Sequence, residues 1–338
     1  MEKITKIEKI GILGAGAFGT AMAAVARRAG REVMLWAYEA EIVDAINMHH
    51  TNEFLSGVEL DPGIRATQDL RVACDVDAVL IAVPTVYLRS IVTQAAAHWP
   101  TGGQAGVPAL ICSKGVEQDS CKLMADVVRD CLGADAVIAS MGGPTFAKEI
   151  ARDLPSATTL ACADLDVANR LATALSSPHF RIYTTQDTVG TQLGGAAKNV
   201  LAIACGIVTG MGLGDNARAA LITRGLAEIN ALGQVLGANS QTLMGLSGLG
   251  DLTLTCNATQ SRNFSLGFRL GQGEMIDTIM GGSKTIAEGY YNAQTVTELA
   301  RRNQVDMPIC LAVEAVLNVD ADLESIIHGL LSRPLVSE

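Results

Sequence analysis

A glycine-rich segment near the N-terminus constrains the fold of this chain more than any other feature. The β-branched run Lys9–Leu13 leads directly into Gly14–Gly19 (GAGAFG), and a stretch rich in alanine follows, as expected for a closely packed helix. In such a strand–turn–helix unit the first glycine permits a tight turn, the second admits a pyrophosphate and the third lets helix and strand pack closely. A turn without a ligand is the alternative, but the flanking strand and helix favour dinucleotide binding at the positive helix end. The glycines concerned are Gly14, Gly16 and Gly19.

Short β-branched runs alternate with helical segments as far as about residue 183, which predicts a mostly parallel sheet with helices on both faces. The predicted strands are Lys9–Leu13, Glu32–Trp36, Ala78–Val83, Ala109–Ser113, Ala136–Ser140, Thr158–Cys162 and Arg181–Tyr183. Beyond about Thr188 the strand-like runs stop and helices broken by glycine-rich points follow. With 338 residues, 49% of them hydrophobic, the chain is long enough for two domains. We predict an α/β protein with an N-terminal Rossmann-like, doubly wound sheet over residues 1–190 and an all-helical C-terminal domain over residues 191–338.

Composition argues against several other classes of protein. The net charge of -10 opposes nucleic-acid binding, and no block of lysine or arginine would suit a membrane surface. The eight cysteines form no CxxC pair and no ligand cluster with the five histidines, which predicts reduced thiols in an intracellular protein without a metal site. The first residues lack the continuous apolar stretch of a secretory signal. The longest apolar run, 200–214, is short for a membrane span, so we expect a buried helix in a cytoplasmic protein.

An acidic protein that holds an anion needs local cations, and two lysines are candidates. Lys114 follows a predicted strand, and the carboxyl ends of strands form the ligand crevice of a doubly wound sheet; a solvated loop lysine is the alternative. Lys198 stands among small and apolar residues on a predicted buried helix. It either reaches solvent or lines a polar cavity, where a lowered pKa would suit proton transfer. We favour the cavity, because perturbed titratable groups concentrate at functional sites.

Two further charged residues lie beside small polar neighbours in the second half of the chain. Asp251 ends the glycine-rich run 246–250, where its carboxylate either pairs with a lysine or caps a helix. Arg262 lies between Ser261 and Asn263, and a planar guanidinium in such a setting suits a phosphate dianion; a surface arginine is the alternative.

The end of the second predicted strand bears on the choice of cofactor. An acidic residue there binds the ribose hydroxyls of NAD, whereas an arginine accommodates the 2′-phosphate of NADP. The sequence reads Trp36-Ala37-Tyr38-Glu39, with no arginine in the turn. Glu39 therefore favours NAD weakly, although a solvated surface glutamate explains it equally well.

Taken in order, the motifs closely resemble those of the bacterial NAD(P)-dependent glycerol-3-phosphate dehydrogenases. The matching segments run from residue 9 to beyond residue 290 and so cover most of the chain. No single segment is decisive, but the ordered set is highly specific. The segments are GAGAFGTAMA at 14–23, SKG at 113–115, GGPTFAKE at 142–149, GAAKNVLAIACGI at 195–207, GLGDLTLTC at 248–256, SRN at 261–263 and AEG at 287–289.

The resemblance implies roles for individual residues. Lys198 matches the catalytic acid/base, Lys114 a lysine that binds substrate and lies near the nicotinamide, and Asp251 a carboxylate that interacts with the catalytic lysine and substrate. The implied substrate contacts are Lys114, Gly143, Thr145, Lys198, Asp251, Ser261, Arg262 and Asn263. The implied cofactor contacts, beyond the three glycines, are Ala17, Phe18, Tyr38, Lys114, Ala147, Arg262, Ile286 and Glu288.

Three positions depart from the family pattern. Members often carry tryptophan at Phe18, serine at Thr145, and arginine or histidine near Tyr38. The first two replacements are mild, whereas the third leaves the preference between NAD and NADP open. The resemblance also implies a homodimer with a helical domain for substrate binding and dimerisation, and a supply of glycerol 3-phosphate for phospholipid synthesis.

The predicted reaction is hydride transfer between NAD(P)H and dihydroxyacetone phosphate. Two alternatives stay open at this point. One is a related two-domain reductase of the hydroxy-acid or ketopantoate type, and the other is a nicotinamide-sensing regulator that keeps the fold without the chemistry.

Overall fold

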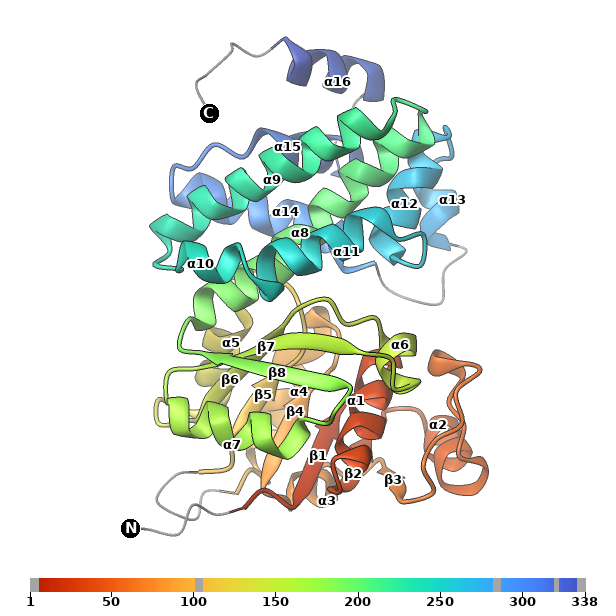
Figure 1. Cartoon of the computed structure of the whole chain (residues 1–338), viewed down its shortest axis with the longest axis vertical. Helices are drawn as coiled ribbons and strands as arrows, with labels where there is room; N and C mark the ends of the chain where they lie inside the picture. The colour runs from red at the N-terminus through yellow and green to blue at the C-terminus, as the bar shows by residue number, and fades with distance from the viewer. Residues whose placement is uncertain (1–5, 101–105, 282–286, 319–321, 333–338) are drawn as a thin grey trace. The chain divides into compact units, whose positions relative to one another are not determined.

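The chain divides by its internal contacts into two units (Figure 1). The sheet unit comprises Met1–Lys114 and Lys122–Gln192, and the helical unit comprises Gly115–Cys121 and Leu193–Glu338. The structure is a computed structural model that describes residues 6–100, 106–281, 287–318 and 322–332. The sequence predicted a single division after residue 190 and therefore placed Gly115–Cys121 in the first domain. The structure instead packs this segment against a helix of the second unit, an arrangement that local sequence patterns do not reveal.

The sheet unit is built on eight strands in the order β3-β2-β1-β4-β5-β6-β7-β8. All neighbouring strands are parallel except β6 and β7, which are antiparallel. The predicted doubly wound, mostly parallel sheet is thus confirmed. The strands are β1 Lys9–Leu13, β2 Glu32–Trp36, β3 Ile64–Thr67, β4 Ala78–Ile81, β5 Ala109–Ile111, β6 Ile138–Gly142, β7 Ser156–Cys162 and β8 Phe180–Thr185.

Helices cover both faces of this sheet because successive side chains of a strand point to opposite faces. Ile12 of β1 lies in one core with residues of α1, α6 and α7, whereas its neighbour Leu13 lies in the other core with residues of α3, α4 and α5 (Figure 1). The helical elements are α1 Ala17–Arg28, α2 Ala40–Asp44, a π-helix Ala45–His49, a 3₁₀ turn Glu53–Leu55, α3 Leu70–Cys74, α4 Thr85–Ala96, α5 Met124–Leu132, α6 Ala147–Ala151 and α7 Leu165–Leu175.

The regular elements described after Thr188 are all helical, as the sequence predicts. They are α8 Thr188–Gly210, α9 Asp215–Val235, α10 Ser240–Leu243, a π-helical turn Leu246–Gly250, α11 Asp251–Asn257, α12 Arg262–Gly271, α13 Ile276–Gly281, α14 Glu288–Arg302, α15 Pro308–Asn318 and α16 Leu323–Leu331.

Helix α8 is the central feature of the helical unit. It has 23 residues and is long and apolar enough to cross a membrane, but 89% of its most apolar window is buried within the protein. The expected buried helix is therefore present, and it is longer than the run 200–214 suggested because it begins at Thr188. Glycines let α8 and α12 approach closely: a Cβ on Gly206 would lie 2.1 Å from the Phe264 carbonyl oxygen, and one on Gly267 would lie 2.0 Å from that of Ile203.

Candidate active site

The glycine turn between β1 and α1 has the geometry of a phosphate-binding loop. Gly14 has a φ of +111°, in the region that favours glycine, and its amide donates to the Trp36 carbonyl oxygen over 3.0 Å. A Cβ on Gly19 would lie 1.9 Å from the Gly14 carbonyl oxygen, so this glycine is required for packing. Gly16 is exposed, with open space where a Cβ would stand, at the N-terminus of the 12-residue helix α1. The turn therefore offers open backbone at a positive helix end and fits a dinucleotide pyrophosphate.

A buried asparagine holds the start of this turn in place. The Asn52 side-chain amide donates to the Ala15 carbonyl oxygen and to the Thr20 hydroxyl, both over 2.8 Å. No local sequence pattern predicts this role for Asn52, because the residue lies far along the chain and also caps the short turn that starts at Glu53.

The other predicted cofactor residues described in the sheet unit lie at exposed or half-buried positions. Ala17 and Phe18 begin α1, and Ala147 begins α6. Tyr38 follows β2 and is 76% exposed, and Glu39 beside it is also exposed without capping α2 through its side chain. Each of these positions is thus accessible to a ligand.

Lys114, Gly143 and Thr145 come together after the ends of β5 and β6. The Lys114 ammonium donates to the Gly143 carbonyl oxygen over 3.1 Å, and the Thr145 hydroxyl donates to the same oxygen over 3.2 Å. Gly143 has a φ of +149°, and a Cβ there would lie 2.9 Å from the Thr158 hydroxyl oxygen. The half-buried ammonium thus lies at the carboxyl ends of parallel strands, where doubly wound sheets bind ligands.

Lys198 is buried inside the helical unit and paired with Asp251. Its Nζ donates to Asp251 Oδ1 over 2.6 Å and to Thr255 Oγ1 over 2.8 Å. The side chains of Lys198 and Asp251 are 9% and 2% exposed, so the alternative in which Lys198 reaches solvent is wrong. The Thr255 hydroxyl donates to the Asp251 backbone carbonyl over 2.7 Å, which fixes the threonine between the two charged residues.

The same contacts decide between the two interpretations of Asp251. Asp251 is the first residue of α11, whose N-cap position is Gly250, and its carboxylate bonds Lys198 rather than capping the helix. Removing one member of a buried ion pair leaves the other charge without compensation, which typically costs about 3–5 kcal/mol. Such a pair is expensive to maintain for stability alone and is typical of a site with a chemical role.

The Ser261–Asn263 segment divides into one exposed and two buried side chains. The Ser261 hydroxyl caps α12 by accepting from the Phe264 amide over 3.3 Å. The Asn263 side chain donates to Asn199 Oδ1 over 2.8 Å and accepts from the Gly289 amide over 2.9 Å. Arg262 is exposed and is therefore the member of the segment best placed to meet an anion.

One acidic residue of α14 lies close enough to act on this arginine. Glu288 begins α14. Desolvation lowers the pKa of Arg262, and the negative charge of Glu288 partly opposes this shift. The predicted cofactor residue Ile286 lies outside the described residues.

Two polar residues of this region were missed by sequence reasoning. Thr255 lies four residues after Asp251, a spacing that places both side chains on one helix face and could have revealed it. Asn199 follows Lys198 directly, yet no local pattern shows that it meets Asn263.

The described cysteines are all free thiols. Burial raises the pKa of Cys74 to about 11 and that of Cys112 to about 12. Cys256 lies near Lys198. Its pKa is raised mainly by a hydrogen bond with Cys205 and, to a smaller extent, by burial. These thiols are therefore protonated and unreactive near neutral pH.

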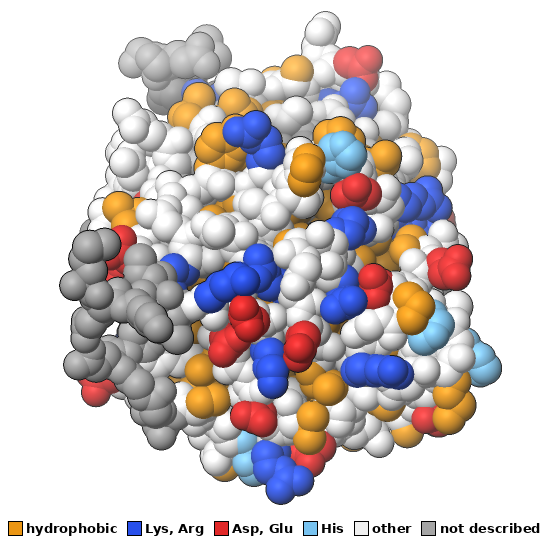
Figure 2. All heavy atoms as spheres, turned by 60° about the horizontal axis from the view of Figure 1, so that its bottom comes forward, with side chains coloured by type: hydrophobic (Ala, Val, Ile, Leu, Met, Phe, Trp, Pro, Cys, Tyr) orange, Lys and Arg blue, Asp and Glu red, His pale blue; other side chains and the backbone are white. Residues whose placement is uncertain are grey.

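On one face of the protein, positive and negative side chains are intermixed. On the face shown in Figure 2, lysine and arginine side chains lie among aspartates and glutamates, without a broad positive area in its coloured part. Ion pairs of the sheet unit such as Arg27–Asp61 and Arg28–Asp153 show the same mixing. Within the described ranges, no group of three or more His, Cys, Asp or Glu side chains could hold a metal ion.

Two family models match the chain. The model of the NAD-dependent glycerol-3-phosphate dehydrogenase N-terminus matches residues 9–168, and that of the C-terminus matches residues 187–328.

Relatives and a solved structure match over nearly the whole length. The glycerol-3-phosphate dehydrogenase [NAD(P)+] of Rhodospirillum rubrum is 54% identical, over 97% of this chain and 93% of that protein. The protein of the same name from Caulobacter vibrioides is 51% identical, over 98% of this chain and 99% of that protein. The crystal structure of glycerol-3-phosphate dehydrogenase from Coxiella burnetii superposes with a TM-score of 0.91 at 37% identity, over 97% of this chain and 99% of that one.

Proposed function

This chain belongs to the NAD-dependent glycerol-3-phosphate dehydrogenase family, and on that premise we propose that it transfers a hydride reversibly between NAD(P)H and dihydroxyacetone phosphate, giving sn-glycerol 3-phosphate. The observation that carries the proposal is the buried Lys198–Asp251 pair, which holds a candidate proton donor inside the helical unit. The open glycine turn, which suits a dinucleotide, supports it.

The sheet unit holds the cofactor. The backbone amides around Gly16 bind the pyrophosphate at the N-terminus of α1. Residues at the edges of this turn and beyond β2 and β6 contact the rest of the dinucleotide, which supplies the hydride when bound. These residues are Ala17, Phe18, Tyr38 and Ala147, with Ile286 and Glu288 added from the C-terminal half of the chain.

Lys198 is the proton donor for the substrate carbonyl oxygen. Asp251 and Thr255 each accept one of its three N–H bonds, which fixes the direction of the ammonium group. Nζ of Lys198 would give its proton to the substrate oxygen as negative charge develops there. Because the lysine is buried, the ammonium acts in a region of low dielectric, where charge stabilisation is strong.

Lys114 and the residues after β6 contribute charge and orientation. Lys114 donates to the Gly143 carbonyl, and its positive charge stabilises the developing oxyanion. Gly143 and Thr145 contact the substrate. The phosphate is bound by Arg262, with Ser261 and Asn263 ordering the backbone that carries it.

Initial-rate measurements with different substrates test the function. Dihydroxyacetone phosphate should be reduced at least a hundredfold more efficiently than ketopantoate or other 2-keto acids, with either NADH or NADPH as donor. Preference for a 2-keto acid would overturn the proposal in favour of the ketopantoate-type alternative, which neither family model supports. Cofactor binding without turnover of any of these substrates would favour the nicotinamide-sensing regulator.

The biological setting follows from the activity. We propose that the protein acts in the cytoplasm as a homodimer and supplies glycerol 3-phosphate for phospholipid synthesis. Sedimentation of the purified protein tests the dimer, and depletion of glycerol 3-phosphate after loss of the protein tests the metabolic role.

A further inference from the structure

A fully buried asparagine on α14 joins two distant parts of the helical unit. Asn292 is 0% exposed. Its Oδ1 accepts from the Val116 amide over 3.4 Å, and its Nδ2 donates to the Ala196 carbonyl oxygen, also over 3.4 Å. Each bond is long, but both are buried, so the side chain connects three backbone segments that lie far apart in the sequence.

Both partners of Asn292 lie two residues from a lysine of the proposed mechanism. Val116 follows Lys114 along the chain, and Ala196 precedes Lys198 on α8. The segment Gly115–Cys121 leaves the end of β5 and belongs to the helical unit. Asn292 therefore binds both the backbone that continues from Lys114 and helix α8, which carries Lys198.

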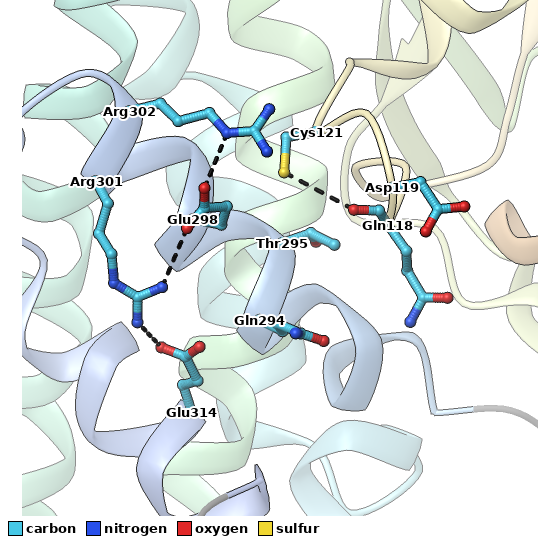
Figure 3. A pocket seen from close by; sticks show the side chains of 9 residues that line it. All are labelled: Gln118, Asp119, Cys121, Gln294, Thr295, Glu298, Arg301, Arg302 and Glu314. Atoms are coloured by element: carbon cyan, nitrogen blue, oxygen red, sulfur yellow. Dashed lines mark hydrogen bonds and ion pairs between the residues drawn. The ribbon is translucent and has the colours of Figure 1, made fainter.

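The same segment is attached to α14 at its far end. It closes a turn in which the Cys121 amide donates to the Glu117 carbonyl over 3.0 Å. Arg302 then donates to the Ser120 carbonyl over 3.0 Å. Figure 3 shows the last turns of α14 facing this segment. Residues of both line a pocket of about 360 Å³. The segment is thus fixed to one helix at two points, Asn292 and Arg302.

We propose that Asn292 is a positioning residue for the reduction, which sets the backbone beside Lys114 and Lys198 at once. The inference rests on the proposed function, because it needs both lysines to act on one substrate. The supporting observation is the convergence of the two backbone segments on one buried amide. An apolar side chain of equal size would leave the Val116 amide without this acceptor, and the segment would relax away from α14.

Kinetics of three variants test this inference. Asn292→Leu removes both bonds at nearly constant volume, and Arg302→Met releases only the far end of the segment from a half-exposed position. Thr297→Val is the matched control: Thr297 is also fully buried on α14, but its hydroxyl bonds only its own helix, at Ala293 and Gln294.

Misplacement of catalytic groups by about 1 Å costs up to ~10²-fold in rate. We therefore expect Asn292→Leu to lower kcat for dihydroxyacetone phosphate by about 10- to 100-fold, where kcat is calculated per NADH-binding site. Its dissociation constant for NADH should change less than about threefold, because most of the proposed cofactor contacts, including the glycine turn, lie in the sheet unit. Arg302→Met should lower kcat by a smaller factor, about three- to tenfold, and Thr297→Val should leave it within about twofold.

The readout separates positioning from stability. A merely structural loss would reduce the number of NADH-binding sites and leave kcat per site unchanged, and this result would overturn the inference. If Asn292→Leu does not fold, Asn292→Ala, which also removes both bonds, takes its place, and a wild-type kcat per NADH-binding site in that variant would overturn the inference. If the wild type fails to reduce dihydroxyacetone phosphate, the proposed function and this inference are both overturned. If the wild type is active and Asn292→Leu is equally active, only the inference is overturned.

Discussion

At the scale of single residues, the buried ammonium of Lys198 has two separable effects. It donates a proton in the proposed reaction, and it compensates the charge of Asp251. Lys198→Met should lower kcat by about 10²- to 10⁴-fold, the contribution of a positioned acid. It should also lower the melting temperature, because Asp251 loses its partner. Steady-state kinetics measure the first effect and thermal melts the second. A variant with kcat within tenfold of the wild type would show that Lys198 is not the proton donor.

The exposed guanidinium of Arg262 should act on substrate affinity. Arg262→Ala should raise the Michaelis constant for dihydroxyacetone phosphate by about 10- to 100-fold, since a hydrogen bond to a charged group contributes about 1.5–3 kcal/mol. Dihydroxyacetone, which lacks the phosphate, is the control substrate, and its kcat/KM should hardly change. An equal loss for both substrates would contradict phosphate binding by this residue.

Gly16 allows the cofactor site to be tested without disturbing the fold. Open space surrounds its Cβ position and its φ is −66°, so Gly16→Val should unfold at nearly the wild-type temperature. The added side chain should nevertheless exclude the pyrophosphate, so saturating NADH should raise the melting temperature of the wild type but not of the variant. Equal shifts in both proteins would place the dinucleotide elsewhere.

The residues of this site differ in how far the sequence could predict them. Lys198 was predictable because a charge among small apolar residues on a buried helix demands a partner. The choice of Asp251 as that partner was open, since a residue after a glycine run also suits a helix cap. Asn52 and Asn292 were not predictable, because each binds backbone groups brought close only by tertiary folding.

At the scale of helices and strands, a buried carboxylate makes the stability of α15 depend on pH. Glu228 of α9 accepts from the Ile309 amide over 2.8 Å and from the Cys310 amide over 3.3 Å at the start of α15. Burial raises the pKa of Glu228 to about 7, against 4.5 as the ordinary value, and Asp306 adds to the rise. The folded state therefore binds the proton more tightly, and the stabilisation present below pH 4.5 is lost as the pH rises through about 7.

Glu228→Gln should abolish this pH dependence. The wild type should lose on the order of 2–3 kcal/mol of unfolding free energy from this group between pH 5 and pH 8. The variant should lose much less, and Glu41→Gln, at an exposed position, is the control. Denaturant unfolding at several pH values measures the effect, and parallel pH profiles for wild type and Glu228→Gln would contradict it.

The contact between α8 and α12 depends on the absence of side chains. Because a Cβ on Gly206 would overlap the Phe264 carbonyl oxygen, Gly206→Ala should force the helices apart and cost about 1–3 kcal/mol. Gly329 in α16 has open space at the same position, so Gly329→Ala should be neutral or stabilising by up to about 1 kcal/mol. Thermal melts compare the two, and equal changes would show that the helices reposition freely.

Prediction from sequence succeeded best for elements with strong local patterns. The strands β1, β2, β4 and β5 were found because each is a short, mostly buried run of apolar residues. The strand β3 was missed, because it is a four-residue edge strand that contains an exposed arginine. The antiparallel direction of β7 depends on how the chain returns to the sheet, and strand composition carries little information about direction.

At the scale of the whole molecule, the sequence predicted a sheet-containing part and a helical part from the disappearance of β-branched runs. It could not show that the helical unit recruits Gly115–Cys121 from within the first half of the chain. That segment carries no helical or strand periodicity, and its place is decided by hydrogen bonds to residues more than 170 positions away, such as Val116 to Asn292.

Because the helical unit includes a segment from the first half of the chain, a chimaera of two relatives cannot exchange this unit through a single junction. A chimaera that joins the first half of one family member to the second half of another at Gln192 would bring the foreign equivalent of Gly115–Cys121 with it. In the chimaera this segment would come from one parent and α14 from the other. The hydrogen bonds of Asn292 and Arg302 to the segment would then join parts of two different proteins. Exchange of specificity between relatives therefore requires two grafts, the large C-terminal portion and this short inner loop.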